Sequence, residues 1–278
     1  MTPLATVAVV LAGGLAAGMI GSLTGLGGGL VIVPLLTLVL HLPIPEAVGV
    51  SLFGVIATSV GAAPRFVGTG LINMRAALVL QVAASTGALV GALTTHHISA
   101  RFLFVLFGLV MLYSSIMSLV PTQSDESGAR WSSPLVERLR LNSRYRQGES
   151  WVEYRVAGVG PAFVTMLGAG FLSALLGIGS GVFKVLAMDK LMHLPFRVST
   201  ATSNFMIGIT AATSAGFYLS HGDVAPIIAG STVLGVLAGA YAGGHWLKNL
   251  STTTLRRVFA MVLMLVAAEM LLKGAFGV

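Results

Sequence analysis

The chain has 278 residues, of which 55% are hydrophobic and 9% are charged, and its formal net charge is +7. Because an average soluble domain carries roughly 25% charged residues, this composition excludes a soluble globular protein and indicates an integral membrane protein. The chain contains no cysteine, which excludes disulfides, thiolate nucleophiles and cysteine-ligated metal sites. We expect the basic residues to reflect membrane topology rather than nucleic-acid binding.

Ten apolar segments are expected along the chain, five on each side of one polar stretch. A bilayer core of ~30 Å needs roughly 20 residues per helical crossing, so most of these segments are long enough to cross. The second segment of each group is shorter, which favours half of a re-entrant hairpin over a full crossing. The segments are expected at 4–23, 28–41, 46–63, 74–95 and 100–120, and then at 155–176, 180–193, 198–219, 224–247 and 254–275.

The two groups are copies of one another at an offset of 152 positions (177 − 25). The motif GLGGG at 25–29 returns as GIGSG at 177–181, and HLP at 41–43 returns at 193–195. A duplicated apolar unit with a glycine break at the same place in each half is the sequence pattern of a secondary transporter. The chain is thus predicted to hold a first transmembrane repeat at 1–120, a cytoplasmic linker at 121–154 with a short surface helix near 135–141, and a second transmembrane repeat at 155–278.

An odd number of segments in each repeat requires the second copy to be inserted upside down. With the N-terminus outside, thirteen of the sixteen Lys and Arg residues fall on the cytoplasmic side, and only Arg101 and Lys273 fall outside. If each glycine-broken pair crossed the membrane as one segment, the copies would be parallel and five of the thirteen would move outside. The predicted fold is therefore an all-α integral membrane protein of the bacterial inner membrane. Its two inverted repeats place both termini outside the cytoplasm, and their glycine-broken helical hairpins meet near the midplane.

The two glycine motifs are expected to unwind, because each glycine costs about 1 kcal/mol relative to alanine inside a helix. Unwinding leaves amide N–H groups that need a protein partner or a ligand in a membrane. The helix that restarts after each break points the positive end of its dipole at the break, which favours an anion. A bend without a ligand is the alternative. The expected ligand groups are the backbone amides of Gly27, Gly28 and Gly29 and of Gly179, Ser180 and Gly181.

Lys184 lies one helical turn beyond Gly181, and its counterpart in the first repeat is Ile32. A lysine at this depth costs roughly 2.5 to 3.5 kcal/mol, so we expect it to face a cavity and supply the countercharge for an anion. A snorkelling side chain or a pair with Asp189 is the alternative. Further hydrogen bonds to the anion are expected from the following helices, where back-bonding to helix carbonyls is equally open. The residues concerned are Ser51, Thr202, Ser203 and Asn204.

No catalytic residue, metal site or cofactor is predicted. His41 and His193 lie at matching helix ends and are expected to be interfacial anchors, and the adjacent pair His96-His97 makes a poor metal site. Pairs such as Gly87-x-x-x-Gly91 are expected to let helices pack closely. An intramembrane hydrolase would need a nucleophile with a base in reach, and His193 with Ser203 is the conceivable pair.

The motifs of both repeats resemble those of the TauE/SafE family of sulfite exporters. The resemblance implies export of sulfite, sulfoacetate or related sulfonates, although some members of that family are associated with uptake of organosulfur compounds. The chain departs from the family pattern at Ser180, where a third glycine is usual, and at Leu186, where a proline is expected. The matching residues are Gly25–Gly29 with Val33-Pro34, Ala47–Ser51, Gly177–Gly181 with Lys184, and Ala201–Ser203.

These observations predict a membrane transporter that exports small sulfur-containing anions through a site where the two glycine breaks converge. The alternatives are an importer of organosulfur compounds, an intramembrane hydrolase, and a subunit that hands sulfur species to a partner protein. The expected partners are a small anionic substrate and the lipid bilayer, with no nucleic acid. A homo-oligomer is compatible with the sequence.

Overall fold

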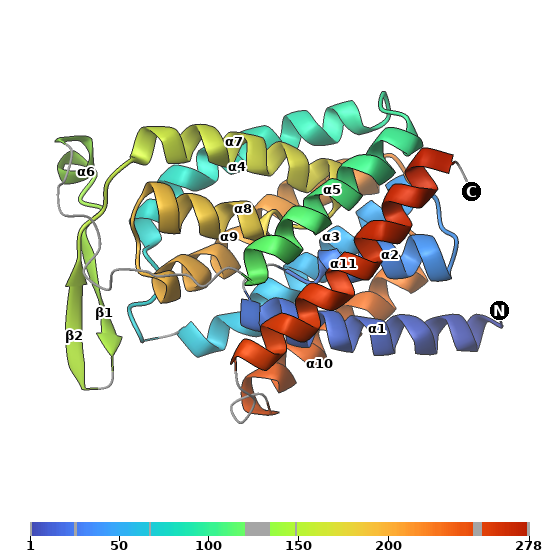
Figure 1. Cartoon of the computed structure of the whole chain (residues 1–278), viewed down its shortest axis with the longest axis horizontal. Helices are drawn as coiled ribbons and strands as arrows, with labels where there is room; N and C mark the ends of the chain where they lie inside the picture. Colours follow the sequence, from blue (N-terminus) through green and yellow to red (C-terminus); the bar gives the residue numbers. More distant parts are fainter. Residues whose placement is uncertain are drawn as a thin grey trace.

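The computed structural model describes residues 2–24, 27–66, 68–119, 134–147, 149–246 and 252–276. Within these ranges the chain forms a bundle of helices with a two-stranded hairpin at one end (Figure 1). Six helices in the described part are long and apolar enough to cross a membrane. The prediction of an all-α, multi-pass membrane protein is therefore confirmed.

All ten predicted segments are helical, and their bounds lie within a few residues of those expected. The first copy consists of α1 (Pro3–Thr24), α2 (Gly29–Pro34) continued by the π-helical η1 (Leu35–Val39), α3 (Ile44–Ala62) continued by the short 3-10 helix η2 (Ala63–Phe66), α4 (Met74–Thr95) and α5 (Ala100–Leu119). The second copy consists of α7 (Val159–Leu176), α8 (Gly181–Leu186) continued by the π-helical η3 (Ala187–Leu191), α9 (Phe196–Ser220), α10 (Pro226–Trp246) and α11 (Thr252–Phe276).

The backbone repeats at the same offset of 152 positions as the sequence. The left-handed conformation recurs at Gly27 (φ 80°) and Gly179 (φ 72°), and again at His41 (φ 54°) and His193 (φ 55°). Each short helix ends in a π turn, in which the amide of Leu40 bonds the carbonyl of Leu35, and the amide of Met192 bonds that of Ala187. The left-handed histidines close these helix ends, because the amide that follows each of them reaches back to the helix, Leu42 to the carbonyl of Leu36 and Leu194 to that of Met188.

The second hairpin keeps the shape of the first although Leu186 stands where the first copy has Pro34. The π turn forms in both copies, so the proline is not its cause. The departure at Ser180 does change the backbone, because Ser180 adopts a left-handed conformation (φ 52°) whereas its counterpart Gly28 has φ −72°. A non-glycine residue in this region carries strain of about 1 kcal/mol or more.

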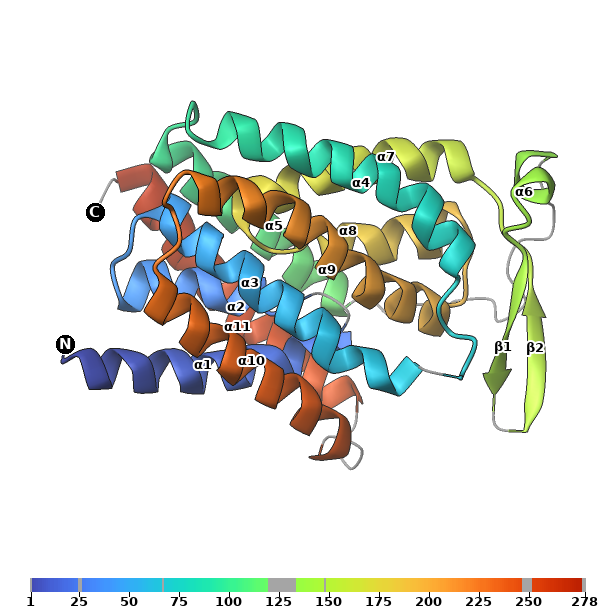
Figure 2. The ribbon, with the colours of Figure 1, turned by 180° about the vertical axis from the view of Figure 1, so that it is seen from behind.

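The copies interlock, since the first helix of each packs on the fourth helix of the other. Helix α1 packs on α10 and α7 packs on α4, while α3 contacts α9 and α5 contacts α11. Figures 1 and 2 show that α1 and α7 run in opposite directions along the bundle. The predicted close packing at glycine pairs is confirmed, because Gly87 lies against the backbone of Leu167 and Gly91 against that of Phe171.

The second segment of each hairpin is too short to cross a membrane alone. Helix α2 with η1 covers Gly29–Val39, which is about 16 Å at a rise of 1.5 Å per residue. The hydrocarbon core is ~30 Å thick. In Figure 1, α2 turns back towards the end of the bundle at which α1 begins.

The linker holds more structure than its composition predicts. The short helix expected there is confirmed as α6 (Pro134–Arg138), but an antiparallel hairpin of β1 (Ser143–Gln147) and β2 (Ser150–Tyr154) follows it. This hairpin lies at the end of the bundle opposite to both chain termini (Figures 1 and 2). The part of the predicted linker at 121–133 lies outside the described residues.

Asn73 at the start of α4 fixes the linker to the bundle. Its side-chain oxygen accepts a hydrogen bond from the amide of Ala76 (3.0 Å), which caps the helix. Its Nδ2 donates to the carbonyl of Leu141 (2.8 Å) and to the Tyr154 hydroxyl (3.0 Å). Burial raises the pKa of the Tyr154 hydroxyl, so this acceptor stays neutral across the physiological pH range.

We expect Gly170→Ala in α7 to lower the free energy of unfolding by about 1 to 3 kcal/mol, the usual cost of overpacking. An added Cβ would lie 2.8 Å from the carbonyl carbon of Ala84 in α4. Gly168→Ala, two residues away on the same helix, is the matched control because nothing lies within 4 Å of its Cβ. Thermal unfolding in detergent compares the two, and equal shifts would show that this glycine contact does not hold α4 to α7.

Candidate functional site

The two glycine breaks are in direct contact at the centre of the bundle. Ser51 on α3 donates a hydrogen bond from its hydroxyl to the carbonyl of Gly177 (2.9 Å), which ends α7 in a left-handed conformation. A Cβ at Gly29 would collide with the same carbonyl and lie 2.8 Å from the Cα of Ile178. The close approach therefore requires glycine at position 29.

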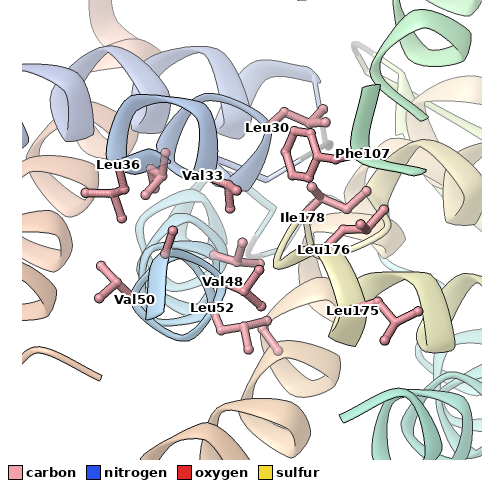
Figure 3. Packing of buried hydrophobic residues seen from close by; sticks show 14 of the residues in the cluster. Leu30, Val33, Leu36, Val48, Val50, Leu52, Phe107, Leu175, Leu176 and Ile178 are labelled. Carbon is pink, nitrogen blue, oxygen red and sulfur yellow. The ribbon is translucent and has the colours of Figure 1, made fainter. Parts of the chain in front are cut away.

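Apolar side chains from both copies enclose this contact. Figure 3 shows the apolar side chains around the point where the two breaks meet. They are Leu30 and Val33 of α2, Val48 of α3, Leu176 at the end of α7 and Ile178 of the second break. All five side chains are almost completely buried. The contact between the two breaks is thus buried in the core of the bundle. Gly25 and Leu26 of the first motif lie outside the described residues.

One amide of the first break has an acceptor among the described residues, whereas those of Gly27 and Gly29 have none. The amide of Gly28 donates to the hydroxyl of Thr58 (3.3 Å), which itself donates to the carbonyl of Gly54 (3.0 Å). In the second break the amides of Gly179, Ser180 and Gly181 have no hydrogen-bond acceptor among the described residues. Buried amides without an acceptor are uncommon and point to a ligand or to water.

Lys184 is completely buried and points into the protein. Its Nζ donates to the hydroxyl of Thr210 on α9 (2.5 Å) and to the carbonyl of Met206 (3.4 Å). Asp189 instead pairs with Lys190 (3.6 Å), so the alternative pair with Lys184 is not formed. In the part of the chain that the structure describes, no carboxylate lies within ion-pair distance of Lys184.

Gln81 on α4 completes the surroundings of Lys184, and the sequence analysis did not select it. Its Nε2 donates to the Thr210 hydroxyl (3.0 Å) and to the hydroxyl of Ser85 (2.7 Å). A signal was available, because the counterpart of Gln81 in the second copy is the apolar Val233, as the counterpart of Lys184 is Ile32. A search for neutral polar residues with apolar counterparts would have found it.

The polar start of α9 serves several purposes. The Thr202 hydroxyl accepts a hydrogen bond from the amide of Asn73 (3.1 Å), so this side chain holds the start of α4. The Ser203 hydroxyl donates to the carbonyl of Gly181 (3.4 Å), which ties α9 to the second break. Asn204 donates from its Nδ2 to the carbonyl of Ser22 (3.5 Å), and its buried Oδ1 has no partner among the described residues.

The pair considered for an intramembrane hydrolase does not form. His193 is exposed, whereas Ser203 is completely buried. A hollow of about 400 Å³ lies between the beginnings of α1 and α10, lined by Val7, Val10 and Ile227 among others, and it includes none of the predicted site residues.

A multi-pass bundle of two interlocked copies, with broken helices meeting beside a buried cation, is the architecture of a membrane transporter. The chain belongs to the sulfite exporter TauE/SafE family, whose model matches residues 10–270. Its relatives are therefore transporters rather than enzymes.

Two curated relatives extend over most of the chain. The probable membrane transporter protein YunE of Bacillus subtilis (strain 168) is 28% identical over 271 residues, which is 95% of this chain and 97% of the relative. The probable membrane transporter protein YdhB of the same organism is 28% identical over 240 residues, which is 86% of this chain and 89% of the relative. No solved structure matches the chain.

We expect Gly29→Ala to lower the free energy of unfolding by about 1 to 3 kcal/mol, because the two breaks can no longer touch. Gly28→Ala is the control, since the nearest atom to its Cβ is the Thr58 hydroxyl at 3.2 Å and its φ of −72° suits any residue. Chemical unfolding in detergent measures both. A Gly29→Ala protein as stable as the Gly28→Ala protein would show that the breaks separate without cost.

Proposed function

We propose that the protein exports small sulfur oxyanions or organosulfonates across the bacterial inner membrane. The observation that carries this proposal is Lys184, a fully buried lysine whose Nζ contacts a hydroxyl and a backbone carbonyl but no carboxylate among the described residues. Burying a charge without a counterion is costly, and such residues in membrane proteins face substrate or ion pathways. The anionic substrate would supply the missing countercharge.

The second glycine break would provide hydrogen bonds to the anionic headgroup. Its amides at Gly179, Ser180 and Gly181 lie at the start of α8, one turn before Lys184. Ser51, Ser203 and Asn204 approach the breaks from α3 and α9 and would add side-chain hydrogen bonds. The first break would contribute the backbone amides of Gly27, Gly28 and Gly29. Thr202 would act indirectly, because its bond to the amide of Asn73 positions α9 against the start of α4.

The breaks are buried, with apolar side chains such as Leu30 and Ile178 packed around them, so substrate would reach them after the hairpins move. We infer alternating access in which each hairpin, or the repeat that carries it, rocks against the other. The short helices α2 and α8 with their π turns are suited to this movement, since they are too short to be anchored on both membrane surfaces.

The topology that fits this proposal puts the linker in the cytoplasm and both termini outside. Both termini lie at one end of the bundle and the linker hairpin at the other (Figures 1 and 2). The cationic residues Arg140, Arg144 and Arg146 belong to the linker end, as expected of a cytoplasmic surface. The repeats would then be 1–120 and 155–278, with 121–154 between them.

Outward movement of an anion needs no coupling ion in a cell that is negative inside. When an anion leaves such a cell, its free energy falls by about 2.3 kcal/mol per unit of charge for each 100 mV of membrane potential. The name of the family model also refers to export of sulfite. Uptake of organosulfur compounds is the competing direction, and the flux measurement below distinguishes the two.

We expect Lys184→Gln to abolish anion flux in proteoliposomes held at a set membrane potential, with sulfite, sulfoacetate, thiosulfate and taurine as test substrates. Loss of flux follows because the substrate loses its countercharge. Lys184→Met is expected to be inactive as well but at least as stable as the wild type, because replacing a buried unpaired charge with an apolar side chain removes a desolvation cost.

Thermal unfolding of the same preparations separates a functional lysine from a structural one. A Lys184→Met protein that transports at the wild-type rate would overturn the proposed site. Flux that proceeds only inward at every potential would overturn the export direction and favour uptake.

A further inference from the structure

The surroundings of Lys184 are polar on one side only, and that side is formed by α4 and α9. A hydrogen-bonded chain connects Lys184 through Thr210 and Gln81 to Ser85, and the hydroxyl of Thr213 donates to Ser85 (3.3 Å). The pseudo-symmetric positions hold Ile32, Thr58 and Gly61 in the first copy and Val233 and Leu237 in the second. Only the threonine is shared, so this network between α4 of the first copy and α8 and α9 of the second has no symmetry-related equivalent.

Two donors from different helices converge on a single oxygen in this network. The Thr210 hydroxyl accepts from the Lys184 ammonium (2.5 Å) and from the Gln81 amide (3.0 Å). It also donates to the carbonyl of Met206 (3.0 Å), as a threonine in a helix commonly does. The Thr210 oxygen thus occupies the position in which an oxyanion oxygen would receive one charged and one neutral donor.

The network reaches the surface between α4 and α9. Lys184 and Thr210 are completely buried and Gln81 is 7% exposed, whereas Ser85 and Thr213 are partly exposed. The exposure of these polar side chains therefore decreases stepwise from the surface between α4 and α9 to the Nζ of Lys184.

We propose that the substrate headgroup binds off the symmetry axis, between α4, α8 and α9, where one of its oxygens replaces the Thr210 hydroxyl between Lys184 and Gln81. Gln81 is then a specificity-determining residue that touches the substrate. This inference rests on the proposed transport function and refines the location of its site.

The charge of the site sets the charge of the substrate. Lys184 can supply one positive charge at most, and the other side chains of the network, Gln81, Ser85, Thr210 and Thr213, are neutral. In the described part of the chain no second cation contacts this network. A headgroup with one negative charge is neutralised there, whereas one with two leaves an uncompensated charge in a medium of low dielectric constant. The site therefore selects monoanions such as sulfonates and hydrogen sulfite over dianions.

Methanesulfonate and sulfate test this selection, because they have the same tetrahedral shape and differ by one charge. We expect wild-type proteoliposomes to transport methanesulfonate with a half-saturating concentration at least about 10-fold lower than that for sulfate. Gln81→Met, which keeps the size of the side chain, should raise the half-saturating concentration for methanesulfonate by about 10-fold or more. Gln81→Glu places a carboxylate beside Lys184 and should reduce flux below about a tenth of the wild type.

Thr86→Val on the same helix is the matched control, because Thr86 is exposed and bonds only the carbonyl of Val82 among the described residues. Its transport should equal that of the wild type. Each variant is compared after size-exclusion chromatography confirms a monodisperse protein, and the wild-type comparison of the two anions needs no variant at all.

The outcomes separate this inference from the function on which it rests. Wild-type protein that moves neither anion nor sulfite overturns the proposed function and the inference together. Wild-type protein that moves methanesulfonate while both Gln81 variants behave like Thr86→Val overturns the off-axis site alone. Sulfate transported as well as methanesulfonate overturns the selection by charge and leaves anion transport intact.

Discussion

A membrane interior offers no water to an unwound backbone, and this constraint determines how the centre of the protein is built. Two chain breaks are placed against each other so that each covers the other. The contact of Gly29 with the Gly177 carbonyl, together with the hydrogen bond from Ser51, satisfies part of the exposed backbone. Among the described residues, the amides of Gly179, Ser180 and Gly181 in the second break have no acceptor and lie close in sequence to the buried Lys184, where a ligand would gain most from binding.

The two copies share a backbone but differ in chemistry. Turns, left-handed residues and helix pairs recur in both, because interlocking packing leaves little freedom to change them. Side chains at the centre are less constrained. There Lys184 is equivalent to Ile32 in the other copy, and Gln81 is equivalent to Val233. Duplication thus gives two copies with the same backbone, of which only the second has a lysine at this position. The two copies therefore offer different side chains to a ligand.

Hydrophobic runs and glycine breaks predicted the ten segments well, since length and hydropathy decide what crosses a membrane. The β-hairpin of the linker could not be predicted, because its strands carry charges such as Arg144 and Glu153, and it is held by the tertiary contact of Tyr154 with Asn73. Lys184 was found because a charge in an apolar run is conspicuous. The neutral Gln81 was not, and the bond of Thr202 to the start of α4 depends on a fold that local sequence does not encode. The roles of these residues in binding remain predictions.

Both hairpins end in a π turn, in which the amide of Leu40 reaches back five residues to Leu35, and that of Met192 to Ala187. A π turn holds one residue more than an α-helical turn, so its carbonyls can exchange a partner five residues away for one four residues away. Each hairpin consequently contains one residue more than an α-helix needs at this turn. A shift of this turn from π-helical to α-helical bonding would move the helix by about 1.5 Å. The proposed movement of a hairpin would then need only a change of hydrogen-bond register at this turn, which avoids the several kcal/mol that an unpaired backbone group costs in lipid.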